Sequence, residues 1–469
     1  MDKKYRNLGK NSLIFTVGNI SSAAISFLLI PLFTHVLSTE EYGLIDFIIL
    51  TITVLIPLVS FNIVEAIIRF GLDGHYDNKR VFSTSIGIFL TVFLLLAIIA
   101  ISITSFFTIP FNIYMIVIML FFVTLYRIIH EFSRANDQLM LYAFADVLYS
   151  VFFAVFNIIL IAYYDFGING YFISYTSAHI LCAVFLLIFG KLYKHFSFSY
   201  IDFKYVKEFI RFCLPLIPSS IAWMATNISN RYLITYFSGF LSLGVYSVAN
   251  KFPILLSNFY NIFAKAWQIS SVQEFNKKDT DIFYSRVFNS LTRFIFLIII
   301  VINAFINIIV HFFIGSEYKE VIYFIPVLLL GFSFYIFSSF LGTIYTASKK
   351  TNGALKTMLV SALVNLIANL ILIPIYGAIA VTVSTLLSYF VLFFYRFNDT
   401  KKVIYIRIET TSFITSIILV FVQIYLIYNI GNIGYLLLLN SIIMVLFFMG
   451  NVEEIRTIYR MIKGVRKKI

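Results

Sequence analysis

Two cations lie well inside long apolar runs of this sequence. Arg231 and Lys251 both occur in residues 212–267, a stretch that reads as two apolar spans joined by the short link 238–242. At about 1.5 Å per residue, Arg231 would lie roughly 9 Å and Lys251 roughly 12 Å below the same membrane face. A cation in hydrocarbon costs at least about 2.5–3.5 kcal/mol, so it persists where it lines a wet cavity or meets an anion. The pair predicts an anion-binding cavity, and snorkelling of the side chains to the nearby surface is the alternative.

Three further ionisable side chains lie within apolar runs and could bind a coupling ion. Asp46 and Asp146 lie roughly 6–10 Å inside their predicted helices, and His179 lies near the middle of another. Either carboxylate could bind a proton or sodium, and the histidine could bind a proton. Interhelical hydrogen bonding is the alternative for each of them.

These residues must be positioned by membrane-spanning helices. The chain has 469 residues, of which 61% are hydrophobic and 12% charged, and apolar runs of about 20 residues recur from end to end. The sequence therefore predicts an all-α polytopic membrane protein with fourteen transmembrane helices. Their expected bounds are 12–36, 42–66, 81–105, 111–131, 139–162, 168–190, 209–237, 243–267, 288–313, 321–346, 354–373, 376–396, 409–429 and 433–450.

The basic residues set the expected orientation of these helices. The net charge is +13, but all except three of the 35 Lys and Arg residues fall in loops on one side of the fourteen-helix arrangement. The exceptions are Lys319, in an opposite loop, and the intramembrane Arg231 and Lys251. Basic residues concentrate in cytoplasmic loops, so both termini are predicted to be cytoplasmic. The basic composition is then a topology signal and predicts no nucleic-acid partner.

The sequence shows no pattern typical of catalysis or of a bound cofactor. It has no phosphate-binding Gly-rich loop ending in Lys-Ser or Lys-Thr, no HExxH and no CxxC spacing. Its two cysteines, Cys182 and Cys213, form no disulfide framework or metal-ligand pattern. The predicted external loops are short, which leaves no place for the acid/base groups of a membrane polymerase or transferase. We expect no enzyme, no cofactor and no metal.

A weak internal repeat predicts two lobes. A span, a short external link with Gly and a second span describe residues 12–66 and equally 212–267, with Gly43 matching Gly244. The repeat is parallel, and such repeats place the substrate between two lobes around a central cavity. We expect an N-terminal six-helix lobe at 1–190, a cytoplasmic linker at 191–208 and a second six-helix lobe at 209–396. Helices 13 and 14 with a basic tail would occupy 397–469.

Several motifs follow one another along the chain: STEEYG at 38–43, LPLIPSS at 214–220, NRYL at 230–233, GVYSVA at 244–249, TASKKT at 346–351 and NLILIPIYGAIAVT at 369–382. In this order they resemble landmarks of one transporter family, the O-antigen or capsular-polysaccharide (Wzx-like) flippases of the multidrug/oligosaccharidyl-lipid/polysaccharide exporter superfamily. The resemblance covers nearly the whole chain. One departure is Asn230, since the family often has an acidic residue at that position, immediately before the arginine.

The resemblance implies a fold of two six-helix bundles that open alternately to each side of a bacterial cell membrane. The implied substrate is an undecaprenyl-pyrophosphate-linked oligosaccharide, moved from the inner to the outer leaflet for capsule, O-antigen or exopolysaccharide assembly. Implied partners are membrane lipid and the polysaccharide polymerase and chain-length machinery. Three alternatives stay open: a lipid II flippase, a drug exporter of the same superfamily, and a membrane polymerase or transferase of the same pathway.

The remaining candidates are two charge pairs and several amides. Glu65 with Arg69, and Arg127 with Glu131, are spaced i,i+4 and could pair on one helical face. Each is either an interfacial ion pair or part of a cytoplasmic gate or pyrophosphate entry site. Asn365 and Asn369 would contact sugar hydroxyls or hydrogen-bond between helices.

Overall fold

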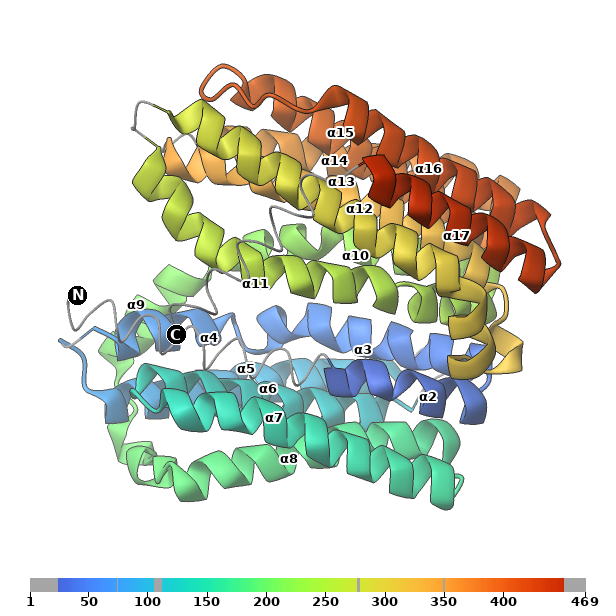
Figure 1. Ribbon diagram of the computed structural model, residues 1–469. Helices are drawn as coiled ribbons and strands as arrows, with labels where there is room; N and C mark the ends of the chain where they lie inside the picture. Colours follow the sequence, from blue (N-terminus) through green and yellow to red (C-terminus); the bar gives the residue numbers. More distant parts are fainter. Residues whose placement is uncertain (1–23, 74, 105–111, 276–278, 349–350, 451–469) are drawn as a thin grey trace, which may run out of the picture. The chain divides into compact units, whose positions relative to one another are not determined.

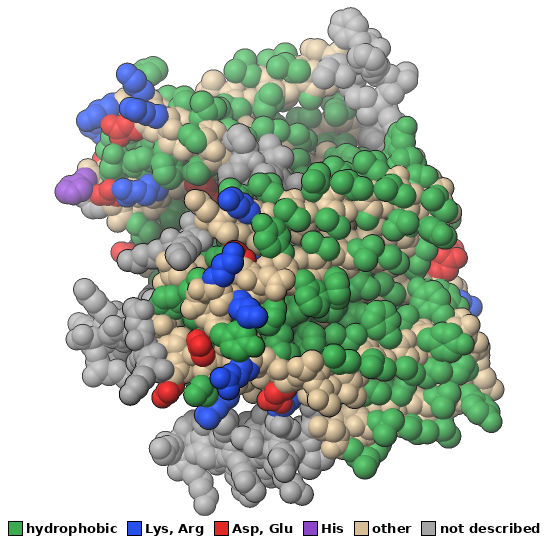
Figure 2. Space-filling model, turned by 90° about the horizontal axis from the view of Figure 1, so that it is seen from above, with side chains coloured by type: hydrophobic (Ala, Val, Ile, Leu, Met, Phe, Trp, Pro, Cys, Tyr) green, Lys and Arg blue, Asp and Glu red, His purple; other side chains and the backbone are tan. Residues whose placement is uncertain are grey.

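The computed structural model describes residues 24–73, 75–104, 112–275, 279–348 and 351–450, and every regular element in these ranges is helical. The chain divides into two compact units, Met1–Ile228 and Ser229–Ile469. Within each unit the long helices run side by side (Figure 1). On the face seen in Figure 2, hydrophobic side chains cover most of the length of the helices, and Lys and Arg gather mainly toward one end.

The helical runs match the predicted spans. Eleven helical runs among the described residues are long and apolar enough to cross a membrane. Two of them, Ile228–Lys265 and Asn352–Thr400, have 38 and 49 residues and are long enough for two crossings each. Gly239 and Gly377, both with positive φ, turn the backbone inside these runs. With the shorter apolar helix Ala24–Val36, the arrangement agrees with the fourteen predicted helices and confirms a multi-pass membrane protein.

The first unit is a helical bundle that includes a short amphipathic helix. Its helices are α2 (Ile30–Val36), α3 (Thr39–Val59), α4 (Ile63–Gly71), α5 (Asn78–Thr104), α6 (Ile113–Ala135), α7 (Leu139–Asn157), a π-helical turn (Ile158–Tyr163), α8 (Gly167–Phe189), 3₁₀ turns at Leu192–His195 and Phe198–Tyr200, and α9 (Phe203–Cys213). The helix α9 packs on α4 and α5. The predicted linker 191–208 is thus folded onto the first unit.

The second unit carries the most deeply buried helix among the predicted spans. Its helices are α10 (Leu216–Ala249, which begins in the first unit), α11 (Lys251–Glu274), α12 (Thr280–Phe313), α13 (Val321–Ala347), α14 (Thr351–Tyr376), α15 (Ala380–Thr400), α16 (Thr410–Asn429) and α17 (Ile433–Gly450), with 3₁₀ turns at Ser316–Tyr318 and Gly377–Ile379. In α13, 83% of the span is buried, since it packs against α11, α12, α15 and α16.

Several of the predicted helices are interrupted inside their expected bounds. The helix expected at 42–66 is divided at Phe61 and Asn62, which have left-handed φ values of 52° and 53°. The helix expected at 209–237 is divided at Leu214 and Pro215, where proline lacks the N–H that a continuous helix requires. The segment expected at 243–267 is interrupted at Asn250, and α11 begins at Lys251.

Local signals also fix several helix ends. Ser38 and Glu41 form a reciprocal cap at the start of α3, in which Ser38 Oγ accepts from the Glu41 N–H over 3.2 Å and the Glu41 carboxylate accepts from the Ser38 N–H over 2.8 Å. This cap starts α3 three residues before the predicted bound. Gly239 has φ 79° and ψ 177°, a conformation essentially restricted to glycine, and it turns the chain inside α10.

Candidate functional site

Asn230, the residue immediately before Arg231, belongs to a cluster of buried side-chain amides. The Asn230 amide nitrogen lies 3.3 Å from Tyr246 Oη and 3.3 Å from Thr385 Oγ1. The Asn369 amide donates to Asn230 Oδ1 over 2.7 Å and to Asn365 Oδ1 over 3.1 Å. These contacts join α10, α14 and α15 within the second unit through neutral groups.

The cation next to this cluster contacts an aromatic ring. Arg231 is half-buried, and its guanidinium carbon lies 5.8 Å from the centroid of the Tyr246 ring, a cation–π contact. Tyr246 is buried and bonds Asn230 through its hydroxyl, so one side chain supports both neighbours. Lys251 is also half-buried and occupies the first position of α11, directly after the interruption at Asn250.

The amides predicted as sugar contacts are both fully buried. Asn365 and Asn369 have 0% exposed area. Their contacts are to each other and to Asn230, which favours the helix–helix alternative over direct contact with a sugar. Within the described residues, Asn365 Nδ2 and Asn369 Oδ1 have no hydrogen-bond partner.

The two predicted i,i+4 pairs do not form. Arg69 pairs instead with Asp73, with Nη1 and Oδ2 3.1 Å apart. Glu65 lies in the first turn of α4, where a carboxylate is stabilised by the helix dipole, and Arg69 lies in the last turn beside the following Asp73. Glu131 pairs with Arg134 over 3.3 Å and accepts from Tyr142 Oη over 3.4 Å. Arg127 is exposed and lies electrostatically close to Tyr175 and His179.

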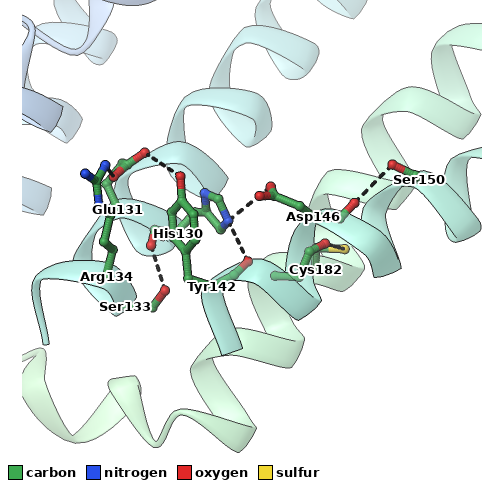
Figure 3. Close-up of polar contacts among 9 residues, drawn as sticks. His130, Glu131, Ser133, Arg134, Tyr142, Asp146, Ser150 and Cys182 are labelled. Carbon is green, nitrogen blue, oxygen red and sulfur yellow. Dashed lines mark hydrogen bonds and ion pairs between the residues drawn. The ribbon is translucent and has the colours of Figure 1, made fainter. Parts of the chain in front are cut away.

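The three predicted ion-coupling residues all lie in the first unit. Asp46 lies half-buried in α3, in the electrostatic neighbourhood of Tyr171 of α8. Asp146 of α7 faces His130 of α6, with Oδ1 and Nε2 3.2 Å apart (Figure 3). His179 of α8 is buried, its Nδ1 lies 2.7 Å from the Tyr175 carbonyl, and its ring packs on Tyr149.

Sequence reasoning missed two functional candidates, His130 and Arg396. His130 was placed at the edge of a predicted span, and the signal that would have identified it is its distance from the turn at 136–138, which nearly matches that of Asp146. The helix predicted at 376–396 ends at Arg396, whereas α15 continues to Thr400, and Arg396 is buried. Its guanidinium bonds Thr357 Oγ1 and the Ser338 carbonyl, each over 3.0 Å.

Comparison with known proteins then places the chain in a family. Residues 8–268 match the family model described as polysaccharide biosynthesis protein. The chain belongs to this family. This agrees with the resemblance drawn from the motifs. The chain is also 24% identical, over 258 residues, to an uncharacterised membrane protein of Methanocaldococcus jannaschii. The match covers 52% of this chain and 50% of that relative, so the chain spans about half the length of the curated relative it matches.

Solved structures share the fold of this family member. The lipid II flippase MurJ in an inward closed conformation superimposes with a TM-score of 0.73 at 15% identity, covering 95% of this chain and 100% of that chain. An inward-facing multidrug resistance MATE family transporter of the MOP superfamily gives a TM-score of 0.57 at 13% identity, covering 88% and 94%. The MATE transporter VcmN of Vibrio cholerae gives 0.54 at 12%, covering 86% and 98%. The chain therefore has the MurJ and MATE fold.

Proposed function

We propose that this protein is a flippase that moves a lipid-linked oligosaccharide across the membrane by alternating access, without enzymatic chemistry. The family supports a role in polysaccharide biosynthesis, and the fold it shares with MurJ and MATE transporters supports transport. The substrate we propose is an undecaprenyl-pyrophosphate-linked oligosaccharide repeat unit. The protein would move this lipid from the inner to the outer leaflet of a bacterial cell membrane. Both termini of the protein would be cytoplasmic.

The observation that carries this proposal is the half-buried Arg231. It lies within a candidate membrane span, and its neighbour in sequence, Asn230, is neutral and already bonded to Tyr246, Thr385 and Asn369. An arginine presents a planar fork that matches phosphate geometry. Since the Tyr246 ring supports the cation by its face, the guanidinium edge is the part that would meet an anion. Lys251, at the start of α11, would supply a second charge to the pyrophosphate.

The amides have a different role in this proposal. The buried Asn365 and Asn369 hold α14 to α10 and thereby fix the helix that carries Arg231. The exposed Arg69, in the last turn of α4, and the exposed Arg127 of α6 would contribute to substrate entry at the cytoplasmic side. Membrane lipid surrounds the apolar helices, and the polymerase and chain-length machinery that consume the product would be partners.

Purified protein in proteoliposomes tests this function. A fluorescent undecaprenyl-pyrophosphate oligosaccharide is placed in both leaflets, and the fraction accessible to an impermeant reagent is followed over time. We expect the wild-type protein to increase the flipping rate over protein-free vesicles, for substrates with several sugars. Flipping restricted to lipid II would assign the chain to the lipid II alternative. Transport of cationic drugs without flipping of either lipid would contradict the proposal.

A further inference from the structure

The pair His130–Asp146 lies between two adjacent helices of the first unit, within candidate membrane spans. His130 Nε2 lies 3.2 Å from Asp146 Oδ1 and 3.1 Å from the Tyr142 carbonyl oxygen (Figure 3). At about 1.5 Å per residue, His130 is roughly 8 Å from the end of α6 at Ala135, and Asp146 is roughly 10 Å from the start of α7 at Leu139. The two residues therefore meet at matched depth on a helical hairpin.

The contacts of this ring determine which nitrogen carries the proton. Both neighbours of Nε2, a carbonyl and a carboxylate oxygen, only accept hydrogen bonds, so Nε2 must be the N–H donor. The neutral ring then has its lone pair on Nδ1. Uptake of one proton at Nδ1 would convert His130 to the imidazolium form, without displacing either contact at Nε2.

The surroundings suit the charged form of this ring. His130 is stacked between two aromatic faces, with its centroid 3.9 Å from that of Tyr142 and 5.1 Å from that of Tyr126. Aromatic faces attract cations. The His130 side chain has only 9% of its area exposed, whereas Asp146 has 30%, so the histidine is the more shielded of the two.

The other charged and titratable groups near the pair are accounted for. On α6, Arg127 is exposed and lies three residues before His130, and Glu131 pairs with Arg134 and accepts from Tyr142 of α7. From α8, His179 and Cys182 lie in the electrostatic neighbourhood of the pair, and Cys182 contacts the Ala145 carbonyl over 3.8 Å. The charged groups on the remaining helices packed against α6 are Glu40, Glu41 and Asp46 of α3, Glu65 and Arg69 of α4, and Lys79 and Arg80 of α5. Among them, Glu41 caps the start of α3, Arg69 pairs with Asp73 and Arg80 pairs with Asp202.

We propose that His130 and Asp146 form a proton-binding site, in which Nδ1 of His130 takes up the proton and Asp146 with the faces of Tyr142 and Tyr126 holds the resulting cation. The proton is the only species gained, and no bond other than N–H forms. Of the two residues, only Asp146 was predicted from the sequence. Proton binding is independent of the proposed transport, whereas its use to drive transport rests on that function.

Nitrogen NMR of the full-length protein, labelled in its six histidines and held in nanodiscs, tests proton binding directly. His130→Gln identifies the His130 signals, and the stacking on Tyr142 identifies them independently by ring-to-ring transfer. We expect Nε2 to stay protonated while Nδ1 changes from unprotonated to protonated as the pH falls. Asp146→Asn should move the midpoint of that change, because the carboxylate next to Nε2 is lost.

A matched variant controls for general electrostatics. Asp137 is an exposed carboxylate in the turn of the same hairpin, so Asp137→Asn should leave the His130 midpoint nearly unchanged. A wild-type His130 that stays neutral to about pH 4, or a midpoint that Asp146→Asn does not move, would overturn the proposal. The wild-type titration decides the first point even where a variant does not fold.

A proteoliposome measurement separates the site from the function. With a proton gradient imposed, wild-type flipping should respond to its size, and Asp146→Asn should lose most of that response. Absence of flipping in every protein together with an intact His130 titration would overturn the proposed transport and leave the proton site in place. Gradient-dependent flipping that is equal in wild type and Asp146→Asn would show that this site does not couple.

Discussion

The amide of Asn369 donates a hydrogen bond to Oδ1 of Asn230 over 2.7 Å, and so ties α14 to the part of α10 that carries Arg231. Both residues are buried, with 0% and 3% of their area exposed. Asn230 in turn contacts Tyr246, whose ring supports Arg231. The Asn369 amide thus links the position of α14 to the position of Arg231.

Removal of this amide should destabilise the second unit. Asn369→Leu keeps a similar volume but leaves Asn230 Oδ1 buried without its donor. An unsatisfied buried polar group costs about 1–3 kcal/mol, so the unfolding midpoint in detergent should fall measurably. Asn352→Leu, at an exposed position of the same helix, should have little effect and serves as the control. Equal stability of Asn369→Leu and wild type would show that the cluster does not hold the helices together.

The helices could largely be predicted from the sequence, but the contacts between them could not. Apolar length and Lys/Arg placement predict the spans, and the Ser38–Glu41 cap is readable from residue types alone. The turns at Phe61–Asn62 and at Asn250 lie inside long apolar runs, so apolar length and Lys/Arg placement do not predict them.

The pairing of side chains was harder to predict for the same reason. Along the sequence, Arg69 has a carboxylate both four residues before and four residues after it, and spacing does not decide between Glu65 and Asp73. The contact between His130 and Asp146 depends on the tight turn at 136–138, which folds α7 back on α6. The burial of Arg396 depends on four further residues of α15 beyond the predicted end.

Arg396 should be required for stability in a way that lysine cannot replace. It is 7% exposed, and its guanidinium reaches Thr357 Oγ1 and the Ser338 and Ala354 carbonyls at 3.0, 3.0 and 3.5 Å. A lysine ammonium is a single point charge and cannot span three acceptors in this geometry. Arg396→Lys should therefore lower the free energy of unfolding by about 1–3 kcal/mol.

Two comparisons sharpen the Arg396 test. Arg407→Lys, at an exposed position that follows α15, is the matched control and should be nearly neutral. A Cβ added at Gly342 would lie 3.0 Å from Arg396 Nη1, so Gly342→Ala should also destabilise by displacing the guanidinium. Chemical unfolding of purified protein measures all three. A fully stable Arg396→Lys protein would contradict the role assigned to the guanidinium group of Arg396.

Asp202 should give the protein a pH dependence on the acid side. The backbone N–H of Lys204 donates to this carboxylate over 2.9 Å, and Arg80 lies 2.8 Å away, and together they hold the pKa of Asp202 below its usual value. A carboxyl with a lowered folded-state pKa stabilises the fold above its unfolded-state pKa of about 3.9. That contribution is lost as the pH falls through the folded-state pKa.

Unfolding midpoints measured from pH 7 to about pH 3 should show this difference. Asp202→Asn retains a side-chain oxygen for the cap of α9 but has no charge to titrate, so its stability should fall less steeply with acid than that of the wild type. Asp137→Asn, at an exposed turn without an ion-pair partner among the described residues, should follow the wild-type curve. Identical curves for Asp202→Asn and wild type would show that this carboxyl contributes nothing to the acid transition.

Arg231 and Lys251 should bind the anionic group of the transported lipid. A hydrogen bond between a charged donor and phosphate is worth about 1.5–3 kcal/mol, so loss of one should weaken binding by roughly ten- to a hundred-fold. Arg231→Lys should recover only part of the affinity, since the guanidinium fork is lost. Lys319→Gln, an exposed cation outside the candidate spans, is the matched control.

The most direct test is the flipping rate of the Arg231→Gln, Lys251→Gln double variant in proteoliposomes, at equal protein content and with unfolding midpoints matched to wild type. We predict a loss of apparent affinity for the pyrophosphate-linked oligosaccharide that exceeds the roughly ten- to a hundred-fold expected for one lost contact, with the Lys319→Gln control unaffected. Wild-type flipping by the folded double variant would contradict the account, because it would show that the two membrane cations only extend to the surface and take no part in substrate binding.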